Sequence, residues 1–236
     1  MSALYLIRHG QAGTRDDYDR LSTLGHEQTR LLGSYFASQR IPFARLVSGA
    51  LKRQQETAAN TIEELRAAGA NCPQLSVDPA WNEFDLDDVY RQIAPQIAAV
   101  DPEFRQGYEE LLRSIESPAA AIHRTHSELD IAVVLSWIAN RFPYTGESFH
   151  AFAARIHRAL EAVKPEPGPI AVFTSATPTG LAVAAALGLP VERAMRLAGV
   201  VYNSSFSTLR LQPDAITLFS FNNIPHLTDA RHRTFR

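Results

Sequence analysis

The sequence predicts an α/β fold: a three-layer sandwich with a mostly parallel central sheet and helices on both faces. The first observation is that short β-prone runs alternate with stretches of helical apolar spacing, the pattern of strand–helix–strand units. The second is that the chain has 236 residues, 45% hydrophobic and 20% charged, as in ordinary globular proteins. This length supports one sizeable core, and this composition excludes a disordered chain or a fibrous repeat.

The first half of the chain alternates strands and helices. Apolar residues at helical spacing between 24 and 36 predict a first helix, for which Ser22 or Thr23 can serve as the N-cap. A second helix is expected from about 51 to 68. Polar, Asp-rich sequence at 14–20 indicates an exposed loop before the first helix. Three β-prone runs precede, separate and follow the two helices, at residues 3–7, 44–47 and 75–77.

The second half begins with a long helical stretch at 85–142, which the sequence punctuates with Pro95, Pro102, Pro118 and Pro143. Another amphipathic helix begins near Ser148. The strand pattern then returns, at 169–174, 206–211 and 215–221, with a helix predicted at 178–187 and Thr177 as its N-cap. A polar tail rich in arginine follows and is expected to be solvated. We therefore expect a single domain over residues 1–236 with a helical insertion at about 85–145.

The charges nearly cancel, with 23 Lys and Arg against 25 Asp and Glu. A chain without an overall basic field is not expected to bind nucleic acid, although a local pocket for a small anion is compatible with it. The single cysteine, Cys72, cannot form an internal disulfide, which fits a reducing compartment. The apolar runs are too short to span a membrane and no signal-type segment opens the chain, so a cytoplasmic location is expected. A homodimer is compatible with the expected edge strands and exposed aromatic residues.

The first candidate for chemistry is Arg8-His9-Gly10, where the first strand passes into a loop. In open α/β sheets, ligands bind at the carboxyl ends of the strands. His9 there can serve as a nucleophile or a base, or it can be a buried structural histidine. Arg8 is an unusual residue for the end of an apolar strand, because an unpaired buried guanidinium is very costly. A bound anion would offset that cost.

A second cationic element follows the second strand, at residues 48–58. Arg53 lies about one turn into the predicted helix, where its side chain can reach back across the edge of the sheet. Lys52 beside it is interpreted as part of a solvated helix face. Arg8 and Arg53 are therefore the candidate ligands of an anion, although they are far apart in the sequence.

Several short motifs recur in a defined order along the chain: Arg8-His9-Gly10, residues 21–28, residues 48–58 with Arg53, Glu83 within 81–85, residues 146–148 with Arg155, and residues 203–205. Together they resemble the histidine phosphatase superfamily, the group that includes cofactor-dependent phosphoglycerate mutases. The match is spread over most of the chain. Motifs for nucleotide-fuelled enzymes, zincins and serine hydrolases are absent from the sequence.

The resemblance implies a phosphate chemistry without metal or cofactor. His9 would attack phosphorus and form a phosphohistidine, while Arg8 and Arg53 would hold the phosphoryl oxygens with forked hydrogen bonds. Glu83 would protonate the leaving oxygen and later activate water. The nearby Asp85, Asp87 and Asp88 are alternative proton donors, and they can also be residues of an exposed loop. The helical insertion would cover the site and set specificity for a small phosphorylated substrate.

The sequence departs from the family at one position. The family has a second histidine after a late strand, and the corresponding position here is Ser175, with no histidine between His157 and His226. Ser175 can donate one neutral hydrogen bond to phosphate but cannot carry positive charge. The leading interpretation is a phosphomonoester hydrolase with reduced turnover. The alternatives are a relative that binds a phosphate ester as a sensor or partner without catalysis and, third, a phosphoglycerate mutase.

Overall fold

The computed structural model describes residues 2–13, 17–115, 128–164 and 167–235. The chain comprises two compact units. The first unit comprises Met1–Glu83 and Arg155–Arg236, and the second comprises Phe84–Ala154. Residues 116–127, which belong to the predicted insertion and include Pro118, lie outside the described residues.

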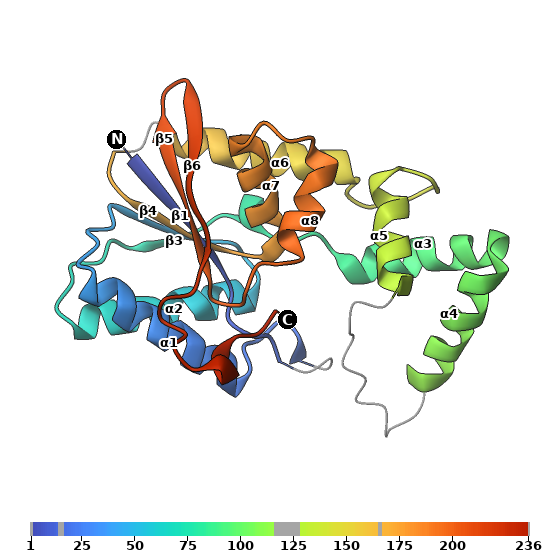
Figure 1. Cartoon of the computed structure of the whole chain (residues 1–236), viewed down its shortest axis with the longest axis horizontal. Helices are drawn as coiled ribbons and strands as arrows, with labels where there is room; N and C mark the ends of the chain where they lie inside the picture. The colour runs from blue at the N-terminus through green and yellow to red at the C-terminus, as the bar shows by residue number, and fades with distance from the viewer. Residues whose placement is uncertain (1, 14–16, 116–127, 165–166, 236) are drawn as a thin grey trace. The chain divides into compact units, whose positions relative to one another are not determined.

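The first unit contains a six-stranded sheet in the order β3-β2-β4-β1-β5-β6 (Figure 1). β1, β2, β3 and β4 run parallel, whereas β5 is antiparallel to both of its neighbours. This mixed, mostly parallel sheet confirms the predicted fold class. The strands are Ser2–Arg8 (β1), Arg45–Ser48 (β2), Leu75–Val77 (β3), Ile170–Thr174 (β4), Phe206–Gln212 (β5) and Ala215–Asn223 (β6).

The register of the parallel strands brings their carboxyl ends to one edge. Arg8 at the end of β1 is paired with Thr174 at the end of β4, and Ser48 at the end of β2 is paired with Phe173 and with Val77. The loops that leave β1, β2, β3 and β4 therefore start side by side, although they are up to 166 residues apart in sequence. This edge is where ligands bind in such sheets.

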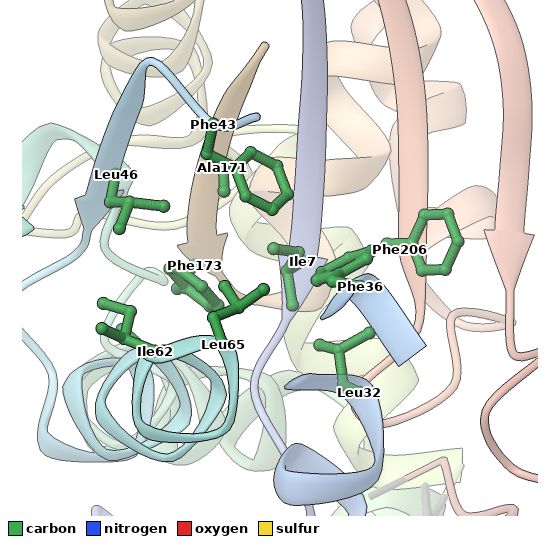
Figure 2. Packing of buried hydrophobic residues seen from close by; sticks show 11 residues of the cluster. Ile7, Leu32, Phe36, Phe43, Leu46, Ile62, Leu65, Ala171, Phe173 and Phe206 are labelled. Atoms are coloured by element: carbon green, nitrogen blue, oxygen red, sulfur yellow. The ribbon is translucent and has the colours of Figure 1, made fainter. Parts of the chain in front are cut away.

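Helices cover both faces of this sheet. On one face, α1 (Thr23–Ser38) and α2 (Lys52–Ala67) pack against each other and against the strands, and α7 (Ala176–Ala186) lies on the other face (Figure 1). Figure 2 shows the core beneath α1 and α2, where Leu32 and Phe36 of α1 meet Ile7 of β1. Burying an aliphatic or aromatic side chain of this size contributes roughly 1.5–3 kcal/mol. This core anchors the two helices whose N-terminal ends adjoin the carboxyl edge of the sheet.

The helix ends differ from the prediction at one informative place. α1 begins as expected, with the Ser22 hydroxyl accepting from the amide of Gly25. α7, however, begins at Ala176 with Ser175 as the N-cap, so the prediction of Thr177 at that position was wrong. Pro178 is the third helical residue. A proline is tolerated throughout the first turn, where its missing N–H would have no helical partner, so it did not mark the first residue.

The second unit is helical. It contains α3 (Leu86–Val100), α4 (Pro102–Ile115), α5 (Glu128–Ile138) and the start of α6 (Phe149–Val163). The expected interruption at Pro95 was wrong, because α3 continues through it. A proline inside a helix removes a hydrogen bond and costs about 3 kcal/mol. The buried face of α3, with Val89, Ile93 and Ile97, offsets that cost.

Short elements complete the described chain: η2 (Pro79–Trp81), η3 (Val191–Arg193), α8 (Ala194–Ala198) and η4 (Ala230–His232). Within the described residues, the structure contains no helix with the length and apolar character needed to cross a membrane.

Candidate active site

His9 stands at the end of β1 with its backbone held on two sides. Its N–H donates to the carbonyl of Thr174 at 2.9 Å, and its own carbonyl accepts from the Ser204 amide at 3.1 Å and the Asn203 carboxamide at 3.3 Å. The ring Nδ1 lies 2.7 Å from the carbonyl of Gly10. Because a carbonyl can only accept, Nδ1 carries the proton and Nε2 of the neutral ring presents a lone pair.

Arg53 reaches that lone pair from the first turn of α2. Its Nε–H donates to His9 Nε2 at 3.3 Å, and the guanidinium lies over the ring of Tyr18 with 5.1 Å to the ring centroid. The Arg53 residue is buried, whereas Lys52 beside it is exposed. The structure thus brings together His9 and Arg53, which are 44 residues apart in sequence.

Burial and two neighbouring positive charges favour the neutral form of the His9 ring. Burial lowers the pKa of His9 well below its usual 6.5, and the positive charges of Arg53 and Arg8 lower it further. The hydrogen bond to the Gly10 carbonyl opposes this shift but does not reverse it. A neutral imidazole, whose Nε2 carries a lone pair, is the form that acts as a nucleophile.

Arg8 supplies a second buried guanidinium at the same edge. Its Nη1 donates to the carbonyl of Val201, but its Nε–H has no hydrogen-bond partner among the described residues. Burial lowers the pKa of Arg8 to about 10; Tyr18 and Glu83 oppose this shift, while Arg53 adds to it. Arg8 therefore remains charged at neutral pH, with one buried donor free to bind an anion.

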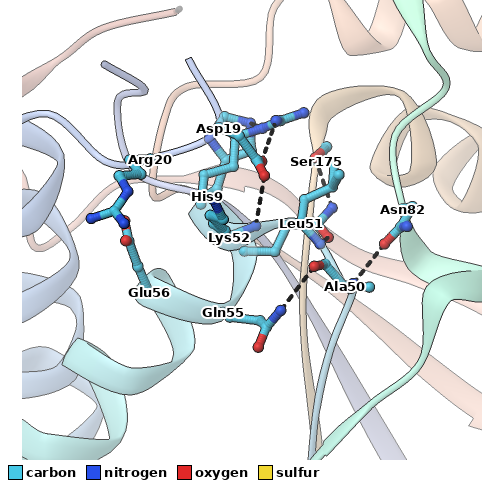
Figure 3. Close-up of polar contacts among 12 residues, drawn as sticks. His9, Asp19, Arg20, Ala50, Leu51, Lys52, Gln55, Glu56, Asn82 and Ser175 are labelled. Carbon is cyan, nitrogen blue, oxygen red and sulfur yellow. Dashed lines mark hydrogen bonds and ion pairs between the residues drawn. The ribbon is translucent and has the colours of Figure 1, made fainter. Parts of the chain in front are cut away.

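Asp19 is a site residue that the sequence analysis missed. Its carboxylate accepts from Arg53 Nη1 at 2.9 Å and from the backbone N–H of Lys52 at 3.3 Å, as the dashed lines of Figure 3 show. It therefore binds both the guanidinium and the N-terminal end of α2, where a helix stabilises negative charge. The sequence indicated only an exposed Asp-rich loop, and nothing in the pattern distinguished Asp19 from its neighbours.

We expect the Asp19→Asn substitution to strengthen phosphate binding, because the Asp19 carboxylate holds a donor of Arg53 that an incoming anion needs. The Asp19 side chain is 44% exposed, and pairs of this kind contribute up to about 1 kcal/mol. The inhibition constant for inorganic phosphate should therefore fall roughly two- to fivefold. Asp17→Asn is the matched control, since Asp17 pairs with Arg20 instead. Equal effects of the two substitutions would contradict a direct role for Asp19.

Glu83 lies at the end of the loop that follows β3. Its carboxylate accepts from the backbone N–H of Thr177, in the first turn of α7, at 3.0 Å. The loop before it is held by Arg155, which donates to the carbonyls of Ala80 and Asn82, and by the Ala50 amide, which donates to the Asn82 side chain (Figure 3). Glu83 is thus placed near Arg8, whose charge it stabilises.

The alternative proton donors belong to the helical unit. Asp85 caps α3 by accepting from the amide of Asp88. The pKa of Asp88 is lowered, first by its hydrogen bond from Gln92 and then by that from Tyr144. A carboxyl with a lowered pKa is ionised at neutral pH and has no proton to donate, which disfavours Asp88 as the proton donor. No cluster of three or more metal-ligating side chains occurs within the part of the chain that the structure describes.

Ser175 caps α7 directly after β4, next to the strand end that carries His9. Its hydroxyl oxygen accepts from the carboxamide of Gln54 at 2.9 Å, a contact drawn in Figure 3. Gln54 follows Arg53 in α2 and is fully buried. Gln54 belongs to the cationic element at residues 48–58, but its identity alone did not indicate that it would contact Ser175.

Comparison with known protein families identifies the family of this chain. The family model of the histidine phosphatase superfamily (branch 1) matches residues 4–133 and 114–224. The chain belongs to the histidine phosphatase superfamily. Arg8-His9-Gly10 and the Arg53 motif both lie within the matched residues. Among curated proteins, none matches this sequence.

Several solved structures share the fold over nearly the whole chain. A mutant phosphoserine phosphatase from Entamoeba histolytica, in complex with phosphoserine, is 16% identical with a TM-score of 0.63, over 96% of this chain and 100% of that chain. YhfR from Bacillus stearothermophilus is 18% identical with a TM-score of 0.65, over 96% and 99%. A mycobacterial glucosyl-3-phosphoglycerate phosphatase, in complex with inorganic phosphate, is 23% identical with a TM-score of 0.61, over 96% and 99%.

Proposed function

We propose that this protein hydrolyses phosphate monoesters through a phosphohistidine formed on His9. The observation that carries the proposal is the contact of Arg53 Nε with the lone pair of His9 Nε2, at 3.3 Å. It joins a neutral nucleophile to a guanidinium that can hold the oxygens of the group under attack. Arg8, which is buried and whose Nε–H meets no partner in the described parts of the chain, is the second cation of the same anion site. Membership of the histidine phosphatase superfamily supports the same reaction class.

In the first step, the substrate phosphoryl group takes over the donors that Arg53 directs to His9 and Asp19. The Nε2 lone pair forms a bond to phosphorus while the bond from phosphorus to the ester oxygen breaks. The leaving oxygen takes a proton from Glu83. A phosphate dianion beside Glu83 favours the protonated carboxyl, because like charges oppose ionisation.

In the second step, water attacks the phosphohistidine. Glu83, now a carboxylate held by the Thr177 amide, takes the proton of the attacking water. The bond from phosphorus to Nε2 breaks, inorganic phosphate leaves, and the neutral imidazole is restored. Arg8 and Arg53 stabilise the phosphoryl oxygens through both steps. Ser175, whose hydroxyl accepts from Gln54, has its own proton left to donate to a phosphoryl oxygen.

The direct test is hydrolysis of 4-nitrophenyl phosphate, followed by the release of 4-nitrophenolate and of inorganic phosphate. We expect turnover that chelators do not abolish, together with a phosphorylated protein that is stable in alkali and labile in acid, as expected for phosphohistidine. Absence of both turnover and phosphoprotein would instead favour the second candidate, a non-catalytic relative that binds a phosphate ester. Ser175 is the observation that favours this candidate, because a hydroxyl cannot supply the charge of a second imidazole.

The pH dependence should reflect the lowered pKa of His9. The neutral, nucleophilic ring is present above its pKa and is lost as the pH falls through it, so the ring should remain neutral below pH 6.5. The measurement is a titration of the His9 ring proton resonance by NMR, assigned by its loss in His9→Ala. A midpoint at or above 6.5 would contradict the burial and the cationic surroundings on which the proposal depends.

A further inference from the structure

The side chain of Gln54 in α2 forms hydrogen bonds with two residues outside that helix, Trp81 and Ser175. Its side chain is fully buried, and a buried carboxamide must satisfy two N–H groups and one carbonyl. Nε2 donates to the carbonyl of Trp81 at 3.2 Å and to the Ser175 hydroxyl at 2.9 Å, while Oε1 accepts from the Leu51 amide at 3.3 Å. Because Trp81 offers only an acceptor and Leu51 only a donor, the orientation of the carboxamide is unambiguous.

A glycine within the cationic element at residues 48–58 leaves the space for this carboxamide. Gly49 lies against it. A Cβ at that position would overlap the Gln54 amide oxygen and carbon, as well as the Asn82 side chain. A larger residue at position 49 would displace the Gln54 carboxamide from Trp81 and Ser175. The glycine after β2 therefore permits the contact between α2 and the loop that carries Glu83.

Trp81 and Ser175, which accept from Gln54, lie close in sequence to the two residues of the Glu83–Thr177 hydrogen bond. Trp81 is two residues before Glu83, and Ser175 is two residues before Thr177, whose N–H binds the Glu83 carboxylate. Gln54 thus closes a ring that runs from Trp81 to Glu83, across to Thr177, back to Ser175 and through the carboxamide. Thr174 adds a second bond to the Trp81 carbonyl from the end of β4. The Gln54 carboxamide therefore links the loop that carries Glu83 to the start of α7.

We propose that Gln54 is a positioning residue for Glu83, acting through Ser175 and Trp81. The inference rests on the proposed phosphatase function. In this arrangement the Ser175 hydroxyl accepts the hydrogen bond from the Gln54 carboxamide, and it is also a candidate donor to phosphate. Loss of the link leaves Arg8, His9 and Arg53 in place but allows the Glu83 carboxyl to move away from the leaving oxygen. The proton donor is affected while the nucleophile is not.

The test uses the leaving group, because an acidic phenol departs without a proton whereas a less acidic one requires it. The measured quantity is kcat/KM, which excludes the later hydrolysis of the phosphohistidine. In Gln54→Met, kcat/KM for 4-nitrophenyl phosphate should stay within about threefold of the wild type, whereas kcat/KM for phenyl phosphate should fall on the order of 10–100-fold. The inhibition constant for inorganic phosphate should be unchanged. Ser175→Ala should shift the ratio of the two esters in the same direction.

Gln55→Met is the matched control, since Gln55 is the next residue of α2 and donates to Ala50, outside the ring. It should leave the ratio of the two esters unchanged. An active wild type, with equal losses on both esters in Gln54→Met and in Ser175→Ala, would overturn the inference and leave the proposed function standing. A wild type that is inactive on both esters would overturn the proposed function, and this inference with it.

Discussion

Replacement of His9 by alanine should reduce kcat/KM for 4-nitrophenyl phosphate by about a thousandfold or more, the scale found when a nucleophile is removed from an enzyme. His9 Nε2 is the lone pair beside Arg53, and the remaining groups of the site have no nucleophile in the same place. Phosphate binding should survive, because Arg8 and Arg53 stay in position. We expect an inhibition constant or dissociation constant for phosphate within about fivefold of the wild type.

His157→Ala is the control for this substitution, because His157 is an exposed histidine of α6. It should retain wild-type activity and binding. If His9→Ala kept the activity of the wild type, the measured hydrolysis would come from another group or from a contaminant, and His9 would not be the nucleophile. If the wild type and His9→Ala both bound phosphate but neither hydrolysed the ester, the chain would be a binding protein.

Replacement of Arg53 by methionine should have the second large effect, on binding and on turnover together. Methionine keeps a long, flexible apolar stem but removes the guanidinium that donates to His9 and to Asp19. Each charge-assisted hydrogen bond contributes roughly 1.5–3 kcal/mol, so losing two of them from the bound phosphoryl group should lower kcat/KM by at least about a hundredfold. The inhibition constant for phosphate should rise in parallel.

Lys52→Met is the matched control, because it removes one positive charge from the adjacent, exposed position of the same helix turn. Its effect should be no more than a few-fold and should diminish at high salt, as for a screened surface charge. Arg53→Lys should resemble Arg53→Met more than the wild type, since an ammonium lacks the planar fork of donors. Similar losses in Lys52→Met and Arg53→Met would indicate a general effect of charge.

The meeting of Arg8, His9 and Arg53 was predictable because parallel strands place their carboxyl ends at one edge. Two short strands, each followed by basic residues, were sufficient to place Arg8 and Arg53 near each other. The resemblance to the superfamily added Glu83 and Ser175, which the residues alone did not identify. The strand bounds were close to those observed, and β3 at Leu75–Val77 was predicted without change.

Other parts of the site depend on tertiary contacts that no local pattern encodes. Asp19 belongs to a loop of several acidic residues, and only the folded chain shows that it contacts Arg53. The role of the tail is similar. Thr234 donates to the Asn203 carboxamide, which in turn donates to the His9 carbonyl, so the end of the chain supports the nucleophile. The expectation that the tail is a solvated end holds for the exposed side chains of Arg231 and Arg233 but not for Thr234.

A crystal structure with bound vanadate tests the central claim most directly, because vanadate adopts the geometry of a phosphoryl group under attack. The account predicts vanadium bonded to His9 Nε2, with its oxygens accepting from Arg53 and from the Nε–H of Arg8, and with Asp19 no longer paired with Arg53. Vanadate bound elsewhere on the molecule, with Arg53 still paired with Asp19 and His9 unmodified, would contradict the account.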